Sequence, residues 1–300
     1  MKPYLWMMDY TPQKEWIERQ GLILWLAFFF AEIGAGLYLV SLFFAFWRGC
    51  LAGWLISAIV GGGFHMLYLG KPERAWRAIL RPVKSELSRG LVIMLLFVVV
   101  GAIQIAPSLS PFSFLPWQSD TLLLKILMAV LSFFVISHGF MTMNAVSAIP
   151  FWNSAILPVL SVASGVWLGT QLGISLASAF SNKALWLSLE PVARWSLFVY
   201  AFLIIYYFWN AGHAAPAVKE SLRVIVKGDL SGPFYVCVVL IGLVIPIAVS
   251  LYYWANGMGQ GESFVYLRIV CALIGDVSLR YAISKSGRYS PLIYSNAVRS

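Results

Sequence analysis

Long apolar runs, separated by short polar segments, make up most of the chain. A helix needs about 20 apolar residues to cross a hydrocarbon core of roughly 30 Å, and each run is close to that length or longer. The runs lie at residues 21–47, 51–69, 90–106, 122–148, 156–176, 192–212, 234–254 and 264–283. A short polar loop with Lys183 and Glu190 separates the fifth run from the sixth. The pattern predicts an all-α integral membrane protein with about eight transmembrane helices.

These spans are expected to form one polytopic membrane domain over residues 1–300, built as two four-helix bundles. The first four spans fall within 21–148 and the last four within 154–283. Residues 1–20 are amphipathic and lack the basic start and immediate apolar run of a signal peptide, so we expect them to stay uncleaved on the membrane surface. Residues 284–300 form a tail, and eight spans place both termini on one side.

Composition supports the membrane assignment, because the chain is 60% hydrophobic and only 11% charged, whereas soluble domains are about 25% charged. The net charge of +9 does not indicate nucleic-acid binding, since the basic residues lie in short loops between spans, where orientation signals occur. The cysteines, Cys50, Cys237 and Cys271, form no CxxC motif. We therefore expect no iron–sulfur cluster and no metal site in this chain.

The distribution of Lys and Arg predicts an orientation. Sixteen of the 21 lie on the predicted side that holds both termini and the loops after spans two, four and six. By the positive-inside rule the termini face the cytoplasm. However, six of the sixteen come from residues 71–89, and a segment that docks an acidic partner would also be basic.

Glu32 is the first candidate for chemistry, because a charged side chain inside a membrane span is costly and needs a reason. It interrupts the first span just before Gly34, Ala35 and Gly36, small residues that let a helix or a flat ring approach closely. The Glu32 carboxyl group either accepts a proton beside a bound ring or pairs with a neighbouring helix.

The histidines lie toward the same end of spans two, four and six, at His65, His138 and His213. Histidine exchanges protons near neutral pH, so His65 and His138 are candidates for proton transfer. Each could instead make a structural hydrogen bond, and His213 suits the C-terminus of its helix. A haem needs two facing histidines at matched depth. These positions allow at most one haem, and we expect none.

Asp276 and Arg280 are four residues apart in the eighth span, which is a favourable spacing for a helix ion pair. The pair is interpreted mainly as structural, with a role in proton exit as the alternative.

The segment 71–89 is the densest run of charge outside the spans. Its charges alternate with Trp76, Ile79, Leu80 and Leu87. Such a segment can lie on the membrane interface with its aliphatic stems buried, dock a soluble partner, or do both. The candidate docking residues are Lys71, Arg74, Arg77, Arg81, Lys84 and Arg89.

Two stretches carry a resemblance to a known family. YLGKPERAWRAILRPVKSELSRG, at 68–90, is similar to the stretch after the second span of NrfD-type membrane subunits. GFMTMNAVSAIPFWNSAILPVLSVASGVWLG, at 139–169, is similar to that family's fourth span, turn and fifth span. The small-residue patch at 34–36 also fits, and the resemblance covers spans one to five.

The resemblance implies a haem-free subunit in the cytoplasmic (inner) membrane of a prokaryote that binds a quinone, either menaquinone or ubiquinone. It also implies two partners, a four-cluster iron–sulfur subunit and a catalytic subunit with molybdopterin and Mo or W. The family's quinone pocket lies inside the first four helices, on the side of the termini. Leu24 and Ala27 stand where the polysulfide reductase anchor has polar residues, so the pocket here is either intact with different side chains or altered.

The candidate quinone-site residues are therefore Glu32 and His65 for proton exchange, Asn144 or Asn153 for a ring carbonyl, and Trp25 or Trp152 for ring packing. The candidates for proton transfer are Glu32, His138, Asp276 and Arg280. The alternatives are a proton-coupled transporter or channel and a cytochrome b-type anchor with a single haem.

Overall fold

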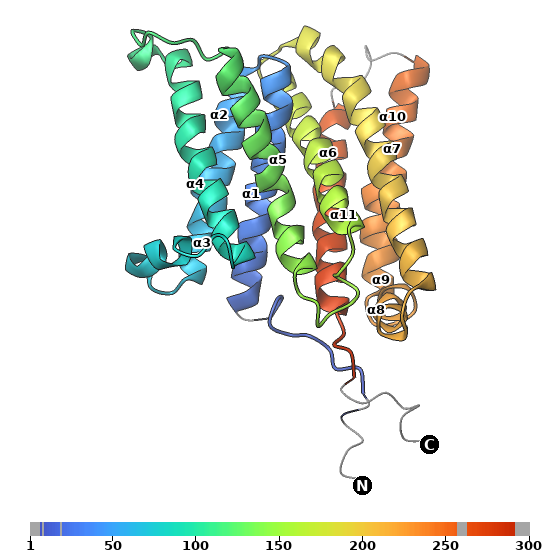
Figure 1. The fold of residues 1–300 in the computed structure, drawn as a ribbon. Helices are drawn as coiled ribbons and strands as arrows, with labels where there is room; N and C mark the ends of the chain where they lie inside the picture. The colour runs from blue at the N-terminus through green and yellow to red at the C-terminus, as the bar shows by residue number, and fades with distance from the viewer. Residues whose placement is uncertain (1–6, 8, 19, 257–262, 292–300) are drawn as a thin grey trace.

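The computed structural model describes residues 7, 9–18, 20–256 and 263–291, and these fold into helices joined by short connections (Figure 1). The long helices are α1 (Gln20–Phe43), α4 (Glu86–Ile105), α5 (Leu122–Asn144), α6 (Ile156–Ala179), α7 (Lys183–His213) and α11 (Ser263–Ser286). Two spans contain π-helical stretches: α2 (Trp47–Leu55) continues through η2 (Ile56–Gly61) into α3 (Gly62–Tyr68), and α9 (Ser231–Pro233) through η6 (Phe234–Val244) into α10 (Ile245–Asn256). Shorter helices are η3 (Pro72–Ile79), η4 (Ala106–Ser108), η5 (Ser110–Phe112) and α8 (Pro216–Val226).

Seven of the described helices are long and apolar enough to cross a membrane: Gln20–Phe43, Trp47–Leu69, Glu86–Ser108, Leu122–Asn144, Ile156–Ala179, Lys183–His213 and Ser231–Asn256. The helix α11 has 24 residues and runs alongside them within the bundle (Figure 1). It is less apolar because it carries Arg268, Asp276 and Arg280, and all three are buried. The prediction of an all-helical membrane protein with about eight spans is confirmed, whereas the grouping into two four-helix bundles stays a prediction.

The predicted polar loop before the sixth span is wrong. Lys183 and Glu190 lie inside α7, a continuous helix with Pro191 in its interior. The helix begins where the Asn182 side chain accepts a hydrogen bond from the Leu185 backbone N–H, at 3.1 Å. Glu190 is fully buried, and its ion pair with Arg268 offsets part of the cost of placing a carboxylate inside a span.

Glycines set how closely α1 approaches its neighbours. A Cβ on Gly36 would lie 2.0 Å from the Gly165 carbonyl oxygen on α6, and a Cβ on Gly34 would lie 2.6 Å from the Gly53 carbonyl oxygen on α2. Side chains at these positions would push the helices apart. The small-residue patch predicted from sequence therefore brings helices into contact on two sides of α1, in the manner of small-residue packing in membranes.

The described residues nearest to the two termini, before α1 and after α11, lie at one end of the bundle (Figure 1). There Pro12 and Arg288 form an antiparallel bridge, and the Gln13 N–H donates to the Gly287 carbonyl at 3.0 Å. Lys285 pairs with Glu18 at 2.6 Å. The described part of the N-terminal segment is thus fastened to the C-terminal tail. The end of the bundle that holds these segments is called the termini side below.

Candidate functional site

The first feature of the interior is an ion cluster that joins four helices, called the central cluster below. Its members are Glu32 on α1, Ser164 on α6, Tyr200 on α7, and Asp276 and Arg280 on α11. The Arg280 guanidinium donates from both terminal nitrogens to Glu32, through Nη1 at 2.6 Å, and from Nε to Asp276 at 2.5 Å. Asp276 Oδ1 also accepts hydrogen bonds from the Ser164 hydroxyl at 2.6 Å and the Tyr200 hydroxyl at 2.7 Å. The predicted Asp276–Arg280 contact is confirmed, but its tie to Glu32 could not be read from spacing.

The charge of the central cluster does not balance. Two carboxyl groups face one guanidinium among the described residues, and Glu32 and Asp276 are each 1% exposed. A net charge inside a low-dielectric interior is expensive. With one proton bound, the cluster becomes neutral while Arg280 keeps both of its partners. The arrangement can therefore hold and release one proton.

A second cluster, called the distal cluster below, lies along α11 on the side away from the termini. Arg268 pairs with both carboxylate oxygens of Glu190 on α7, at 2.7 and 2.6 Å. Its Nε donates to Gln171 on α6 at 2.8 Å, and Tyr253 on α10 lies under the guanidinium at 5.6 Å. Arg268 and Glu190 are fully buried. One anion meets one cation in a bidentate pair, so this cluster balances without a proton.

Sequence reasoning missed the distal cluster, although one signal was present. Arg268, Ala272, Asp276 and Arg280 recur every four residues and thus lie on one face of α11. A membrane helix whose charges all share one face turns that face toward other helices. The pattern could have placed α11 inside the bundle, but it could not have identified Glu190 as the partner of Arg268.

His65 and His138 are brought together on the other side of α1. Both rings pack edge-on against Phe28, with centroids 5.5 and 5.4 Å from it. His65 Nδ1 donates to the Gly61 carbonyl at 2.9 Å. The His138 ring lies against Gly90, where a Cβ would come within 1.7 Å of Nε2. Helix α4 can therefore approach His138 closely only because residue 90 has no side chain.

An apolar slot of about 320 Å³ opens beside His65, between the second span, η3 and α4. Trp76 and Ile79 of η3 cover one side of it, and Met94 lies on the α4 side. Apart from His65, the described side chains around the slot are apolar: Ala58, Gly62, Met66, Leu69, Ala75, Trp76, Ile79, Leu91, Met94, Leu95 and Val98. A narrower crevice shares His65, Leu91 and Met94 with the slot and extends to His138.

A larger hollow of about 870 Å³ lies at the termini side and includes Leu24, one of the positions where the family resemblance placed polar quinone ligands. Its wall carries Lys14, Glu15 and Glu18. Ligand pockets for flat apolar molecules are mostly apolar with few polar groups. The slot at His65 matches that description better than this charged hollow.

The basic segment after the second span is exposed. Lys71, Arg74, Arg77, Arg81, Lys84 and Arg89 all have exposed side chains. Arg89 pairs with Glu86 at 2.6 Å on the surface. The same segment thus presents basic groups outward through Arg74 and Arg77 while Trp76 and Ile79 line the slot.

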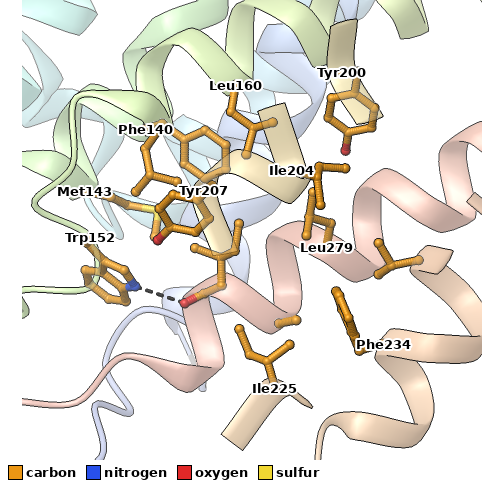
Figure 2. Packing of buried hydrophobic residues seen from close by; sticks show 14 of the residues in the cluster. Phe140, Met143, Trp152, Leu160, Tyr200, Ile204, Tyr207, Ile225, Phe234 and Leu279 are labelled. Carbon is orange, nitrogen blue, oxygen red and sulfur yellow. Dashed lines mark hydrogen bonds between the residues drawn. The ribbon is translucent and has the colours of Figure 1, made fainter. Parts of the chain in front are cut away.

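The remaining predicted residues are distributed differently. Trp152 is fully buried and donates from Nε1 to the Ile283 carbonyl at 2.9 Å, among Phe140, Met143 and Tyr207 (Figure 2). The hydrogen bond to Ile283 fastens the turn between α5 and α6 to α11. The Trp152 ring also contacts the Trp16 ring edge-on, with centroids 5.3 Å apart.

Asn153 is exposed and donates to the Asn144 carbonyl at 2.9 Å, and Trp25 stacks on Phe29 at 6.0 Å. Asn144, Trp152, Asn153 and Trp25 do not line the slot, and neither does Glu32. Among the described residues no group of three His, Cys, Asp or Glu side chains could hold a metal ion.

Two comparisons of the sequence with known proteins point to the same family of membrane subunits. Residues 19–289 match the family described as polysulphide reductase, NrfD. The C subunit of polysulfide reductase from Wolinella succinogenes is 24% identical over 268 residues, which cover 81% of this chain and 83% of that protein. The matched region includes the slot, the basic segment and both ion clusters.

Proposed function

Because the chain belongs to the NrfD family of polysulphide reductase membrane subunits, we propose that it binds quinone or quinol and exchanges electrons with an iron–sulfur subunit. The chain is a multi-pass membrane anchor of a respiratory oxidoreductase by its family and its helices. The finer proposal rests on one observation, the apolar slot at His65 that lies directly beneath the basic segment.

The slot suits a quinone ring in size and chemistry. Sites for small organic ligands are clefts of about 300–1,000 Å³ with apolar walls and a few placed polar groups, and this slot of about 320 Å³ offers His65 as that group. Its Nδ1 is committed to Gly61, and no described residue hydrogen-bonds to Nε2. Nε2 is therefore the atom that would accept a quinol hydroxyl proton or contact a quinone carbonyl.

Oxidation of a quinol releases two electrons and two protons. The electrons would pass to the iron–sulfur partner, docked on the basic segment through Arg74, Arg77 and their neighbours, and onward to a molybdopterin-containing catalytic subunit. The two protons would be taken up one after the other at His65, with His138 behind it across Phe28. The reverse sequence would reduce a quinone with the same groups.

The central cluster would act as a separate proton store. Glu32 faces α6 and α11, where a Cβ on Gly165 would lie 3.6 Å from Glu32 Cγ, whereas Phe28 and Ala31 face the histidines. We therefore assign Glu32, Asp276 and Arg280 to proton transfer away from the ring rather than to ring binding.

Two glycine substitutions test the quinone slot. Gly62 lines the slot, and the atom nearest to an added Cβ lies 3.9 Å away, whereas Gly63 does not line the slot and its Cβ would meet nothing within 4 Å. Gly62→Leu should fill the slot and weaken binding of a short-chain quinone to the purified protein by about tenfold or more, roughly 1.4 kcal/mol. Gly63→Leu is the matched control and should bind normally. Equal affinity of the two variants would reject the slot.

Copurification tests the partners. The tagged protein, extracted from its membrane in mild detergent, should elute with an iron–sulfur subunit and a molybdopterin subunit. Replacing Arg74, Arg77 and Arg81 with Gln should release both subunits, because the docking face loses the positive charges that would attract an acidic partner. A protein that elutes alone and carries a solute across liposomes would favour a transporter instead.

A further inference from the structure

A second pocket lies at the end of the bundle away from the termini, far from the slot at His65. It has a volume of about 180 Å³. Its walls come from the end of α1, the start of α2, the end of α4 and the start of α5. Nothing in the proposed quinone reaction uses it, so its polar lining needs another explanation.

The floor of this pocket is a built polar site. Tyr38 is fully buried, and its hydroxyl donates to Gln104 Oε1 at 2.5 Å. Gln104, 3% exposed, donates in turn from Nε2 to the Ser119 carbonyl at 3.1 Å. These successive hydrogen bonds fix α1, α4 and the connection before α5 around the pocket.

Two opposite charges line the same pocket without pairing. Asp120 and Lys125 both contribute to its wall. Asp120 is exposed and Lys125 is half-buried, and within the described part of the chain neither takes part in an ion pair or a side-chain hydrogen bond, so both side chains are available to a ligand. A group that carries a negative and a positive charge would satisfy both at once.

The surroundings are those of a membrane interface. Trp47 in the pocket wall is 40% exposed, and Phe43 at the end of α1 is 75% exposed. On the other side, Leu122 and Leu123 at the start of α5 are 70% and 73% exposed. Aromatic side chains mark the level of lipid headgroups, and exposed leucines beside them indicate adjacent acyl chains. A polar pocket at this level opens toward headgroups.

We propose that this pocket binds the headgroup of a zwitterionic phospholipid, with the phosphate on Lys125 and the ammonium on Asp120. The volume of about 180 Å³ is below the roughly 300–1,000 Å³ of sites that enclose a drug-sized ligand. It thus suits a headgroup whose acyl chains stay outside against Leu122 and Leu123. The pocket lies in the first four spans, so the lipid would brace the half of the bundle that contains the quinone slot.

Lipid binding to the full-length protein, stripped of lipid in detergent, tests the proposal by native mass spectrometry. Phosphatidylethanolamine should bind more tightly than phosphatidylglycerol, which lacks the ammonium group. Lys125→Ala should weaken both by about tenfold or more, the usual consequence of losing a hydrogen bond to a charged group. Asp120→Ala should lower phosphatidylethanolamine to the level of phosphatidylglycerol and leave phosphatidylglycerol unchanged.

Two control variants separate the pocket from general charge effects. Lys183→Ala removes an exposed Lys at the same end of the bundle and should leave lipid binding unchanged. Lys125→Arg keeps the cation and should retain phosphatidylethanolamine. A melting temperature equal to that of the parent protein in lipid-free detergent identifies variants that remain folded.

Three results would overturn the proposal. One is a Lys125→Ala variant that binds phosphatidylethanolamine as the parent does. Another is equal binding of the two lipids to the parent protein. The third is competition by inorganic phosphate or phosphoethanolamine at concentrations equal to that of the lipid, which would assign the pocket to a soluble anion or zwitterion.

Discussion

The central and distal clusters are both buried along α11, yet they differ in charge balance. In the distal cluster one guanidinium, Arg268, meets one carboxylate, Glu190, through two parallel hydrogen bonds. In the central cluster one guanidinium, Arg280, meets two carboxyl groups, Glu32 and Asp276. Equal burial therefore does not imply an equal role.

The difference distinguishes a buried ion cluster that holds helices together from one that can exchange a proton. The Arg268–Glu190 pair is already neutral without a proton, so its role is to hold α7 against α11. An unbalanced cluster reaches neutrality only with a proton, so it can exchange one. Removing a charge should therefore damage the distal cluster through stability and the central cluster through function.

The largest expected effect is at the distal cluster. Glu190→Gln leaves Arg268 buried without an anion, and breaking a buried pair in this way costs about 3–5 kcal/mol. The purified variant should unfold at a much lower temperature or fail to accumulate. Replacing both partners, Glu190→Leu with Arg268→Met, should recover most of that loss, since it leaves no unpaired charge. A single variant as stable as the parent would contradict the structural role.

Glu32→Gln should instead change function at small cost in stability. Asp276 remains to balance Arg280, so we expect a loss of stability of less than about 1.5 kcal/mol, the size of an ordinary hydrogen bond. Quinol-linked turnover of the complex should fall by about 100-fold if Glu32 is an obligatory proton acceptor. Unchanged turnover in a folded complex would remove Glu32 from the proton route.

Ser164→Ala tests the hydrogen bonds that hold the central cluster. The Ser164 hydroxyl donates to Asp276 and accepts from Arg280 at 2.9 Å. Its loss should cost about 1–2 kcal/mol, because two charged groups each lose a partner but keep each other. Thermal unfolding in detergent measures this. Ser188→Ala, which removes an exposed hydroxyl bonded within its own helix, is the control and should have no effect.

Tyr200→Phe should give the smallest effect. It removes one hydrogen bond to Asp276 while the ring keeps its stacking on Trp167 at 5.1 Å. Side-chain hydrogen bonds between membrane helices average only about 0.6 kcal/mol, so the melting temperature should drop slightly. Tyr207→Phe, which loses a hydrogen bond to the Phe151 carbonyl instead, should cost the same. A much larger drop in melting temperature for Tyr200→Phe than for Tyr207→Phe would mean that the charged cluster strengthens the Tyr200 hydrogen bond.

Much of the architecture could be predicted from the sequence. The apolar runs indicated the number of spans and most of their boundaries, because the length and hydropathy of a run decide whether it can cross a bilayer. The patch at Gly34–Gly36 indicated close helix packing, and the spacing of Asp276 and Arg280 indicated their contact. The prediction failed at Lys183 and Glu190, where two charged residues suggested a loop but α7 is a continuous helix.

The site was only partly predictable. His65, His138 and the basic segment were identified as polar exceptions to an apolar pattern. Trp152 was expected to pack against a ring, but the structure commits it to Ile283.

The sequence by itself determined that this chain is a helical membrane protein with ionisable residues in its spans, because hydropathy and length are local properties. Only the tertiary structure decided which of those residues meet. Glu32 and Arg280 are 248 residues apart, and which face each helix turns inward depends on contacts such as Gly36 against Gly165. The charge balance of a cluster is a property of the assembled helices, so the distinction between the central and the distal cluster appears only after folding.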